Sequence, residues 1–227
     1  FASVNEVLKP GVQGGSAGTG KSALVTLFED GTYRLKDTVE FPQNAIVGSA
    51  SSSSRPTIEY RGGSGSGGNV KFKSGATMEG LRIEIRKTTG SENIEGGAPV
   101  FEAIGGGVEF RDLEMEAFQN ELDAPVGSYL GINDDSGSNA VVIEDNLFQA
   151  SNGTPVATGH AESSGGGAII RNNQYEDGAS IAGEFSSGDD LTINGNTVAD
   201  PSGAEAFFTF PAEADAGDLT MKRNDFA

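Results

Sequence analysis

The sequence predicts an all-β fold in which the chain winds in laps and each lap stacks its strands on those of the lap before. The first observation is an alternating apolar motif with a charged residue and a turn. It recurs as ATMEGLRI from Ala76, VEFRDLEM from Val108, VVIEDNLF from Val141, AIIRNNQY from Ala168, LTINGNTV from Leu191 and LTMKRNDF from Leu219. Successive copies begin 32, 33, 27, 23 and 28 residues apart, a period typical of solenoids. The second observation is the abundance of Gly, with 34 residues, which suits short strands and tight turns.

The first residues predict a short capping helix and a linker. Ser3 as N-cap and Glu6 three residues later mark the start of a helix, and Pro10 with Gly11 ends it. A Gly- and Ser-rich stretch follows. We therefore assign residues 1–22 to a cap helix and linker, and residues 23–227 to one β domain.

Short apolar or alternating runs predict the strands of that domain. The early runs are residues 23–28, 32–35, 38–41, 45–47, 57–60 and 70–72. A second strand precedes each later motif, at residues 100–104, 128–132, 156–160, 181–185 and 206–210. These strands end 28, 28, 25 and 25 residues apart, so we expect parallel, in-register sheets with neighbouring strands about 4.8 Å apart.

One turn position of the motif predicts a ladder of amide side chains. It is occupied by Asn146, Asn173, Asn196 and Asn224, and by Leu81 and Leu113 in the earlier copies. Stacked Asn side chains hydrogen-bond to one another and to the turn backbone, and Asn tolerates the left-handed conformation. Because an amide is a poor acid, base or nucleophile, this ladder is structural.

The motif copies, with residues 24–41 and AIVGSA from Ala45, resemble right-handed parallel β-helix repeats of the pectate-lyase-like superfamily. The resemblance covers most of residues 23–227. It implies a single-stranded right-handed parallel β-helix whose N-terminal helix covers the first lap. It implies no single activity, because the fold serves lyases, hydrolases, adhesins and phage tail fibres. No matching cap follows Phe226, so we expect further sequence, another subunit or another protein to cover the last lap.

The charge is acidic and uneven. The chain has a net charge of −18, with +3 in residues 1–90 and −21 in residues 91–227. Such a surface repels nucleic acid, and no apolar run reaches the roughly 18 residues that cross a bilayer. The balance is of the haloarchaeal type, in which carboxylates hold hydrated cations under high salt. An ordinary acidic extracellular protein is the alternative.

The segment GSAGTGKS matches the phosphate-loop pattern, with Gly15, Gly20, Lys21 and Ser22 in its fixed positions. A phosphate loop needs a buried strand before it and a long helix after it. Pro10 and Gly11 precede it, and only residues 23–28 separate it from the next turn. We therefore interpret it as a linker and expect no nucleotide cofactor.

Four residues invite a catalytic interpretation. Asp189 and Asp190 resemble the paired aspartates of polygalacturonase-like hydrolases, and Arg171, between Glu144 and Lys222 in one column, resembles the Arg base of pectate lyases. The resemblance is incomplete, because no His follows the aspartate pair. The sequence favours no catalytic site, and a polysaccharide lyase or glycoside hydrolase is the alternative.

His160 is the only histidine of the chain. Equal spacing of the strand ends predicts Ile132 and Phe185 as its neighbours in the stack. We therefore interpret His160 as an aromatic residue stacked on a lap rather than as a general base.

The acidic residues after the second strand of each lap follow the same period, and from Asp134 through Glu162 and Asp190 to Asp215 they are 28, 28 and 25 residues apart. This predicts a ridge of carboxylates that binds Ca²⁺ or high concentrations of monovalent cations, with no cofactor otherwise required. A solvated acidic face without specific sites is the alternative. The ridge comprises Asp134, Asp135, Glu162, Asp189, Asp190, Glu213 and Asp215.

These features predict a structural and adhesive protein of the extracellular space, the cell surface or a virion. Residues 86–98 and 118–127 are long inserts that would present binding loops on a rigid scaffold. The expected partners are other subunits of a larger assembly, including copies of this chain, and a cell-surface glycan. The less acidic first part predicts contact with an acidic partner through Lys71 and Lys73.

Overall fold

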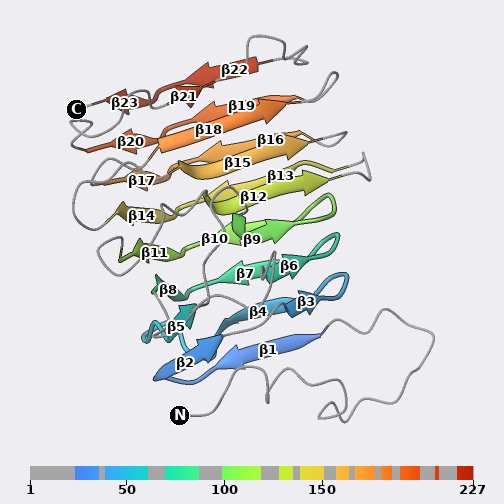
Figure 1. Ribbon diagram of the computed structural model, residues 1–227, viewed down its shortest axis with the longest axis vertical. Coiled ribbons are helices and arrows are strands. Elements are labelled where there is room, and N and C mark those ends of the chain that lie inside the picture. The colour runs from blue at the N-terminus through green and yellow to red at the C-terminus, as the bar shows by residue number, and fades with distance from the viewer. Residues whose placement is uncertain are drawn as a thin grey trace, which may run out of the picture.

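The protein is a stack of short strands in the computed structural model (Figure 1). The structure describes residues 24–35, 39–60, 70–86, 99–118, 128–134, 139–150, 157–163, 167–176, 180–185, 190–199, 208–209 and 219–226. Every regular element in these ranges is a strand, and none of them contains a helix capable of crossing a membrane. The predicted capping helix and phosphate-loop match lie outside the described residues.

Three parallel sheets run along the stack, and each lap contributes one strand to each sheet in turn. Sheet I contains β1 (Val25–Phe28), β4 (Ile46–Ser49), β7 (Thr77–Glu79), β10 (Glu109–Arg111), β13 (Val141–Glu144), β16 (Ala168–Arg171), β19 (Leu191–Asn194) and β22 (Leu219–Lys222). Sheet II contains β2 (Thr32–Leu35), β5 (Thr57–Tyr60), β8 (Arg82–Ile85), β11 (Glu114–Ala117), β14 (Leu147–Ala150), β17 (Gln174–Tyr175), β20 (Thr197–Val198) and β23 (Asp225–Phe226).

Sheet III contains β3 (Val39–Phe41), β6 (Val70–Phe72), β9 (Pro99–Ala103), β12 (Ser128–Asp134), β15 (Ala157–Ser163), β18 (Ser180–Phe185) and β21 (Phe208–Thr209). The architecture is therefore all-β and compatible with a parallel β-solenoid. For the later laps the sequence predicts two strands each, whereas the structure has three, because the turn inside the motif separates a sheet I strand from a sheet II strand.

The motif copies stack in register in sheet I. Val141 is paired with Ala168, Ala168 with Leu191, and Leu191 with Leu219. A one-residue shift would turn every inward side chain outward, so the alternating pattern specifies this register. The predicted in-register stacking of the motif is confirmed.

The core is a set of inward-pointing columns. One column in sheet I runs from Val47 through Met78, Phe110, Ile143 and Ile170 to Ile193, all buried. Aromatic residues stack in the same way: the ring centroids of Phe41 and Phe72 are 4.9 Å apart, and those of Phe148 and Tyr175 are 5.1 Å apart. Since each lap exposes one side of its apolar residues to the next, burial depends on stacking.

The connections between sheets I and II are tight turns with a left-handed residue. The backbone φ is positive at Gly80, Asp112, Asp145, Asn172, Gly195 and Arg223. This left-handed residue is the one before the Asn column, so the expectation that the column itself uses left-handed Asn is wrong. The conformation favours Gly, Asn and Asp, which occupy five of these six positions.

The Asn ladder is confirmed. Nδ2 of Asn146 donates to Oδ1 of Asn173 over 3.0 Å, and the same contact repeats from Asn173 to Asn196 and from Asn196 to Asn224. Each Oδ1 also accepts the backbone N–H of the preceding Asn, and each Nδ2 also donates to a strand carbonyl such as that of Ile143. Asn146, Asn173 and Asn196 are buried, so the ladder satisfies amides that water does not reach.

Candidate functional site

The corner between sheets I and II has one long loop among its tight turns. From β7 onward two residues suffice at this corner, such as Gly80 and Leu81 between β7 and β8. Between β4 and β5 the chain instead forms a loop over residues 50–56, which contains Ser51, Ser52, Ser53 and Ser54. The extra length lets this loop extend along the stack beside the turns of later laps.

Serine hydroxyls hold the loop in shape. Oγ of Ser49 lies 2.7 Å from the carbonyl oxygen of Ser51 and 2.9 Å from that of Ser54, both of which can accept its single proton, and it accepts the Ser51 N–H. The hydroxyls of Ser51 and Ser53 hydrogen-bond to each other over 2.8 Å. Because the side chains of Ser49, Ser51 and Ser53 bond within the loop, it keeps a defined conformation without a hydrophobic core of its own.

Arg55 ties the loop to a turn two laps away. Its Nη1 donates to the carbonyl oxygen of Asp112 over 2.5 Å, and its Nη2 lies 2.6 Å from Oδ1 of the same residue. Between the loop and the turns lies a cleft of about 480 Å³, lined by Ser49, Ser51, Ser52, Ser53, Ser54, Arg55, Glu79, Gly80, Arg111, Asp112 and Asp145. This cleft is not predicted from the sequence, in which the run of four serines is the available signal.

Charged residues close one wall of the cleft. Nε of Arg111 donates to Oε2 of Glu79 over 2.8 Å, and its Nη1 lies 3.4 Å from Oε2 of Glu109. The side chain of Asp145 is exposed and has no partner in the described part of the chain. The wall therefore combines a paired guanidinium with a free carboxylate.

The pair of Glu79 and Arg111 begins a charged column on the outer face of sheet I. The column continues with Glu144, Arg171, Asn194 and Lys222. Nε of Arg171 donates to Oε2 of Glu144 over 2.6 Å. The predicted position of Arg171 between Glu144 and Lys222 in one column is confirmed, and its guanidinium binds a neighbouring strand rather than standing free.

The outer face of sheet II holds a second charged column. Glu59, Glu84 and Glu116 are paired strand to strand and are each less than one-fifth exposed at the side chain. Arg82 lies among them and binds Glu84 at 3.2 Å, Glu114 at 2.7 Å and Glu116 at 2.8 Å. Like-charged neighbours in register would repel, so this guanidinium stabilises the stack.

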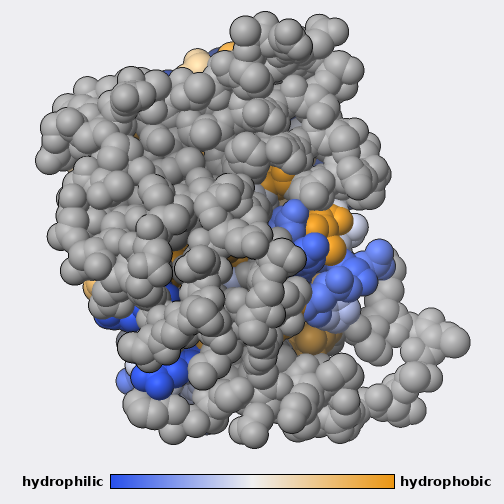
Figure 2. Space-filling view, in the orientation of Figure 1, coloured by the Kyte–Doolittle hydropathy of each residue, from blue (hydrophilic) through white to orange (hydrophobic). Residues whose placement is uncertain are grey.

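Ion pairs also occur on sheet III. Figure 2 shows hydrophilic side chains at the lower left and on the right of the view, the latter directly beside apolar ones. In sheet III, Nζ of Lys73 lies 2.5 Å from Oε1 of Glu40, and Nζ of Lys71 lies 3.7 Å from Oε2 of Glu102. Both lysines that the sequence assigns to an acidic partner thus have carboxylate partners within the chain.

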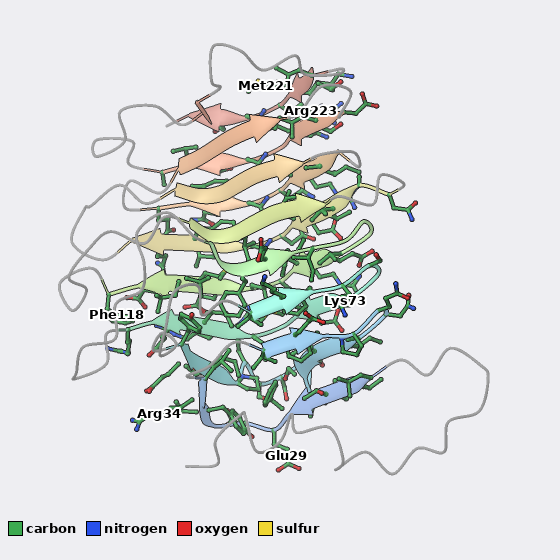
Figure 3. All side chains as sticks on the ribbon, turned by 45° about the vertical axis from the view of Figure 1, so that its right-hand side comes forward. Glu29, Arg34, Lys73, Phe118, Met221 and Arg223 are labelled. Atoms are coloured by element: carbon green, nitrogen blue, oxygen red, sulfur yellow. The ribbon has the colours of Figure 1, made fainter. Side chains whose placement is uncertain are left out.

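The two long inserts leave the stack side by side. They follow β8 and β11, which are neighbours in sheet II, and the Phe118 N–H donates to the Ile85 carbonyl over 3.0 Å. The Arg86 guanidinium carbon lies 3.6 Å from the centroid of the Phe118 ring, a cation–π contact. Figure 3 shows Phe118 on the opposite side of the stack from Lys73. The first residues of both inserts therefore form one joint structure.

The suggested catalytic residues are spread over the stack. Arg171 of β16 is paired with Asn194 of β19, and Asn194 comes four residues after Asp190. Arg171 and Asp190 are therefore about 13 Å apart along the strand direction. His160 is in sheet III, whereas β16 and β19 are in sheet I. Asp189 lies outside the described residues. The structure thus does not bring Asp190 and Arg171 together.

The neighbours predicted for His160 are wrong. His160 is paired with Gly131 of β12 and Ala182 of β18, whereas Ile132 is paired with Ala161 and Phe185 with Ser163. The prediction assumed that strands end at the same level, but β12 and β15 extend beyond the predicted ends and β15 has a register irregularity against β18.

The carboxylate ridge falls mostly outside the described side chains. Asp135, Asp189, Glu213 and Asp215 lie outside the described residues, and only the backbones of Asp134 and Glu162 are described. The register pairs Asp134 with Ser163 and Glu162 with Asn133. Asp190 is exposed, and no cluster of three or more potential metal ligands occurs among the residues that the structure describes. The cation ridge stays a prediction.

The pKa of one core residue is perturbed. Burial raises the pKa of the Tyr60 phenol from 10.0 to about 12, because the ionised form loses its hydration. Tyr60 packs beside Phe101, with ring centroids 6.1 Å apart. Its role is in the core and not in the cleft.

Comparisons with protein-family models, with curated proteins and with solved structures gave no match to this chain.

Proposed function

We propose that this protein is a right-handed parallel β-helix of the pectate-lyase-like kind that acts as a rigid structural and adhesive element. It works on an extracellular, cell or virion surface at high salt and binds a cell-surface glycan through residues 86–98 and 118–127. The observation that carries the proposal is the junction of Arg86 and Phe118, which brings the starts of the two inserts together.

A rigid scaffold supports such a role. Sheets I and II each contain eight stacked strands, and ion pairs on their outer faces join neighbouring laps. Loops on a scaffold of this kind keep their relative positions, which lowers the entropy lost on binding. The acidic composition supports high salt, because cations screen the repulsion among carboxylates.

Replacing residues 87–98 and 119–127 by short Gly-Ser links tests the proposal on a printed array of cell-surface glycans. We expect the parent protein to bind at least one glycan class and the doubly shortened variant to lose that binding with its melting temperature preserved. Shortening residues 200–207, which connect the same two sheets several laps away, is the matched control and should leave binding intact.

Two outcomes would contradict the proposal. One is glycan binding that survives loss of both inserts. The other is cleavage of uronate polymers, seen as absorbance of unsaturated products, which would indicate a lyase instead.

A further inference from the structure

We infer that the cleft beneath the serine loop is a binding site for a sugar unit without negative charge, neutral or amino-bearing. This cleft is lined by residues of the I–II corner, so the inference stands apart from the proposed role of the inserts. Its volume of about 480 Å³ suits one or two sugar rings.

The polar groups of the cleft that lack a protein partner in the described structure suit the neighbouring hydroxyl groups of a sugar. Within the described structure, the hydroxyls of Ser52 and Ser54 and the carboxylate of Asp145 have no protein partner. Nη2 of Arg111 is also without a partner, since its contacts use Nε and Nη1. A sugar hydroxyl both donates and accepts, so neighbouring hydroxyls can bond a carboxylate and a guanidinium together.

The remaining polar contacts of the cleft hold these four unpaired groups in fixed positions. Arg55 is fixed on Asp112, the serine loop is closed by its own hydrogen bonds, and Asp145 follows a strand in a two-residue turn with φ of 56°. The cleft is therefore formed before a ligand arrives, which reduces the cost of binding.

The charge of the lining selects against acids. Arg55 and Arg111 offset two of the three carboxylates of Glu79, Asp112 and Asp145, and the unpaired one is Asp145. A uronate would place a second carboxylate beside it, whereas a protonated amine would gain an ion pair. We expect affinity to fall from amino sugar to neutral sugar to uronic acid.

Titration of the ¹⁵N-labelled protein with the methyl glycosides of glucosamine, glucose and glucuronic acid tests the inference. The amide signals of Ser52, Gly80 and Asp145 should shift with the first two sugars, and glucuronide binding should be at least tenfold weaker than glucosaminide binding. Asp145→Asn keeps the size of the side chain and tolerates the left-handed backbone. It should remove the preference for glucosaminide over glucoside.

Asp30→Asn is the matched control, because Asp30 is an exposed aspartate at the same corner in the first lap, outside the cleft. It should leave all three affinities unchanged. The inference is overturned if no sugar shifts the three amides, if glucuronide binds as well as glucosaminide, or if Asp145→Asn leaves the preference intact. A protein with both inserts shortened should still show the shifts, which separates this result from the test of the proposed function.

Discussion

Asn173 shows how one side chain serves three laps. Its Oδ1 accepts the N–H and Nδ2 of Asn146, while its Nδ2 donates to Ile143 and to Asn196. The position tolerates Leu at Leu113, next to Asn146, because the amide of Asn146 still finds partners there: its Oδ1 accepts the Leu113 N–H and its Nδ2 donates to the Phe110 carbonyl. The ladder is thus a cooperative unit and not four separate residues.

Asn173→Leu should therefore destabilise more than Asn146→Leu. Asn173→Leu leaves the Asn146 N–H, one hydrogen of Asn146 Nδ2 and the Ile143 carbonyl unpaired. Asn146→Leu leaves one group fewer unpaired, namely the Leu113 N–H and the Phe110 carbonyl. An additional orphaned buried group costs about 1–3 kcal/mol, which urea unfolding monitored by circular dichroism resolves. Equal losses for the two variants would show that the side chains act independently.

Tyr60 predicts a loss of stability in alkali. Its folded pKa is about 12, above the unfolded value of 10.0, so the phenol is protonated in both states below pH 10 and contributes no pH dependence there. Between pH 10 and 12 the unfolded phenol ionises first, which lowers the free energy of unfolding by about 2–3 kcal/mol. Unfolding of Tyr60→Phe should have a shallower slope in this range, and identical slopes would contradict the assignment.

At the scale of the elements, alternation in the sequence was enough to predict most strands. The runs over 32–35, 57–60 and 70–72 coincide with β2, β5 and β6. The register of sheet III was not predictable, because β12 and β15 extend into polar residues such as Asn133 and Glu162 that carry no apolar signal. The cleft was missed for a related reason: Arg55 and Asp112 are 57 residues apart, and only the stacked laps bring them together.

Arg82 should be the most important cation of the outer faces. It binds three carboxylates on two neighbouring strands, β8 and β11, and Arg82→Ala leaves Glu84, Glu114 and Glu116 without its compensating charge. We expect a loss of about 1–3 kcal/mol in unfolding free energy, partly recovered in high salt. Arg34→Ala removes the ion pair with Glu59 at the end of the column, where the Arg34 side chain is more than one-third exposed, and should cost less than about 1 kcal/mol. A larger effect for Arg34→Ala would refute this ranking.

For the whole molecule, the net charge of −18 predicts that salt stabilises the fold. The melting temperature should rise from low to molar KCl. If the predicted ridge of carboxylates binds Ca²⁺ specifically, CaCl₂ should raise it further than KCl or MgCl₂ at matched ionic strength. Equal melting temperatures at matched ionic strength would reduce the ridge to a solvated acidic face.

The stacking of laps in register is the claim on which the ladder, the columns and the cleft all depend. The chain has no Cys, so engineered pairs report it without interference. Ile169 and Thr192 are paired between β16 and β19, at a Cα separation of about 5 Å that a disulfide spans. Ile169 and Asn194 are offset by two residues, at about 8 Å, which a disulfide does not span.

Mild oxidation followed by mass spectrometry of the two double-Cys variants is the most direct test of this claim. In-register stacking predicts an intramolecular disulfide in the Ile169→Cys, Thr192→Cys variant and free thiols in the Ile169→Cys, Asn194→Cys variant. A disulfide in the offset variant with free thiols in the aligned one would contradict it.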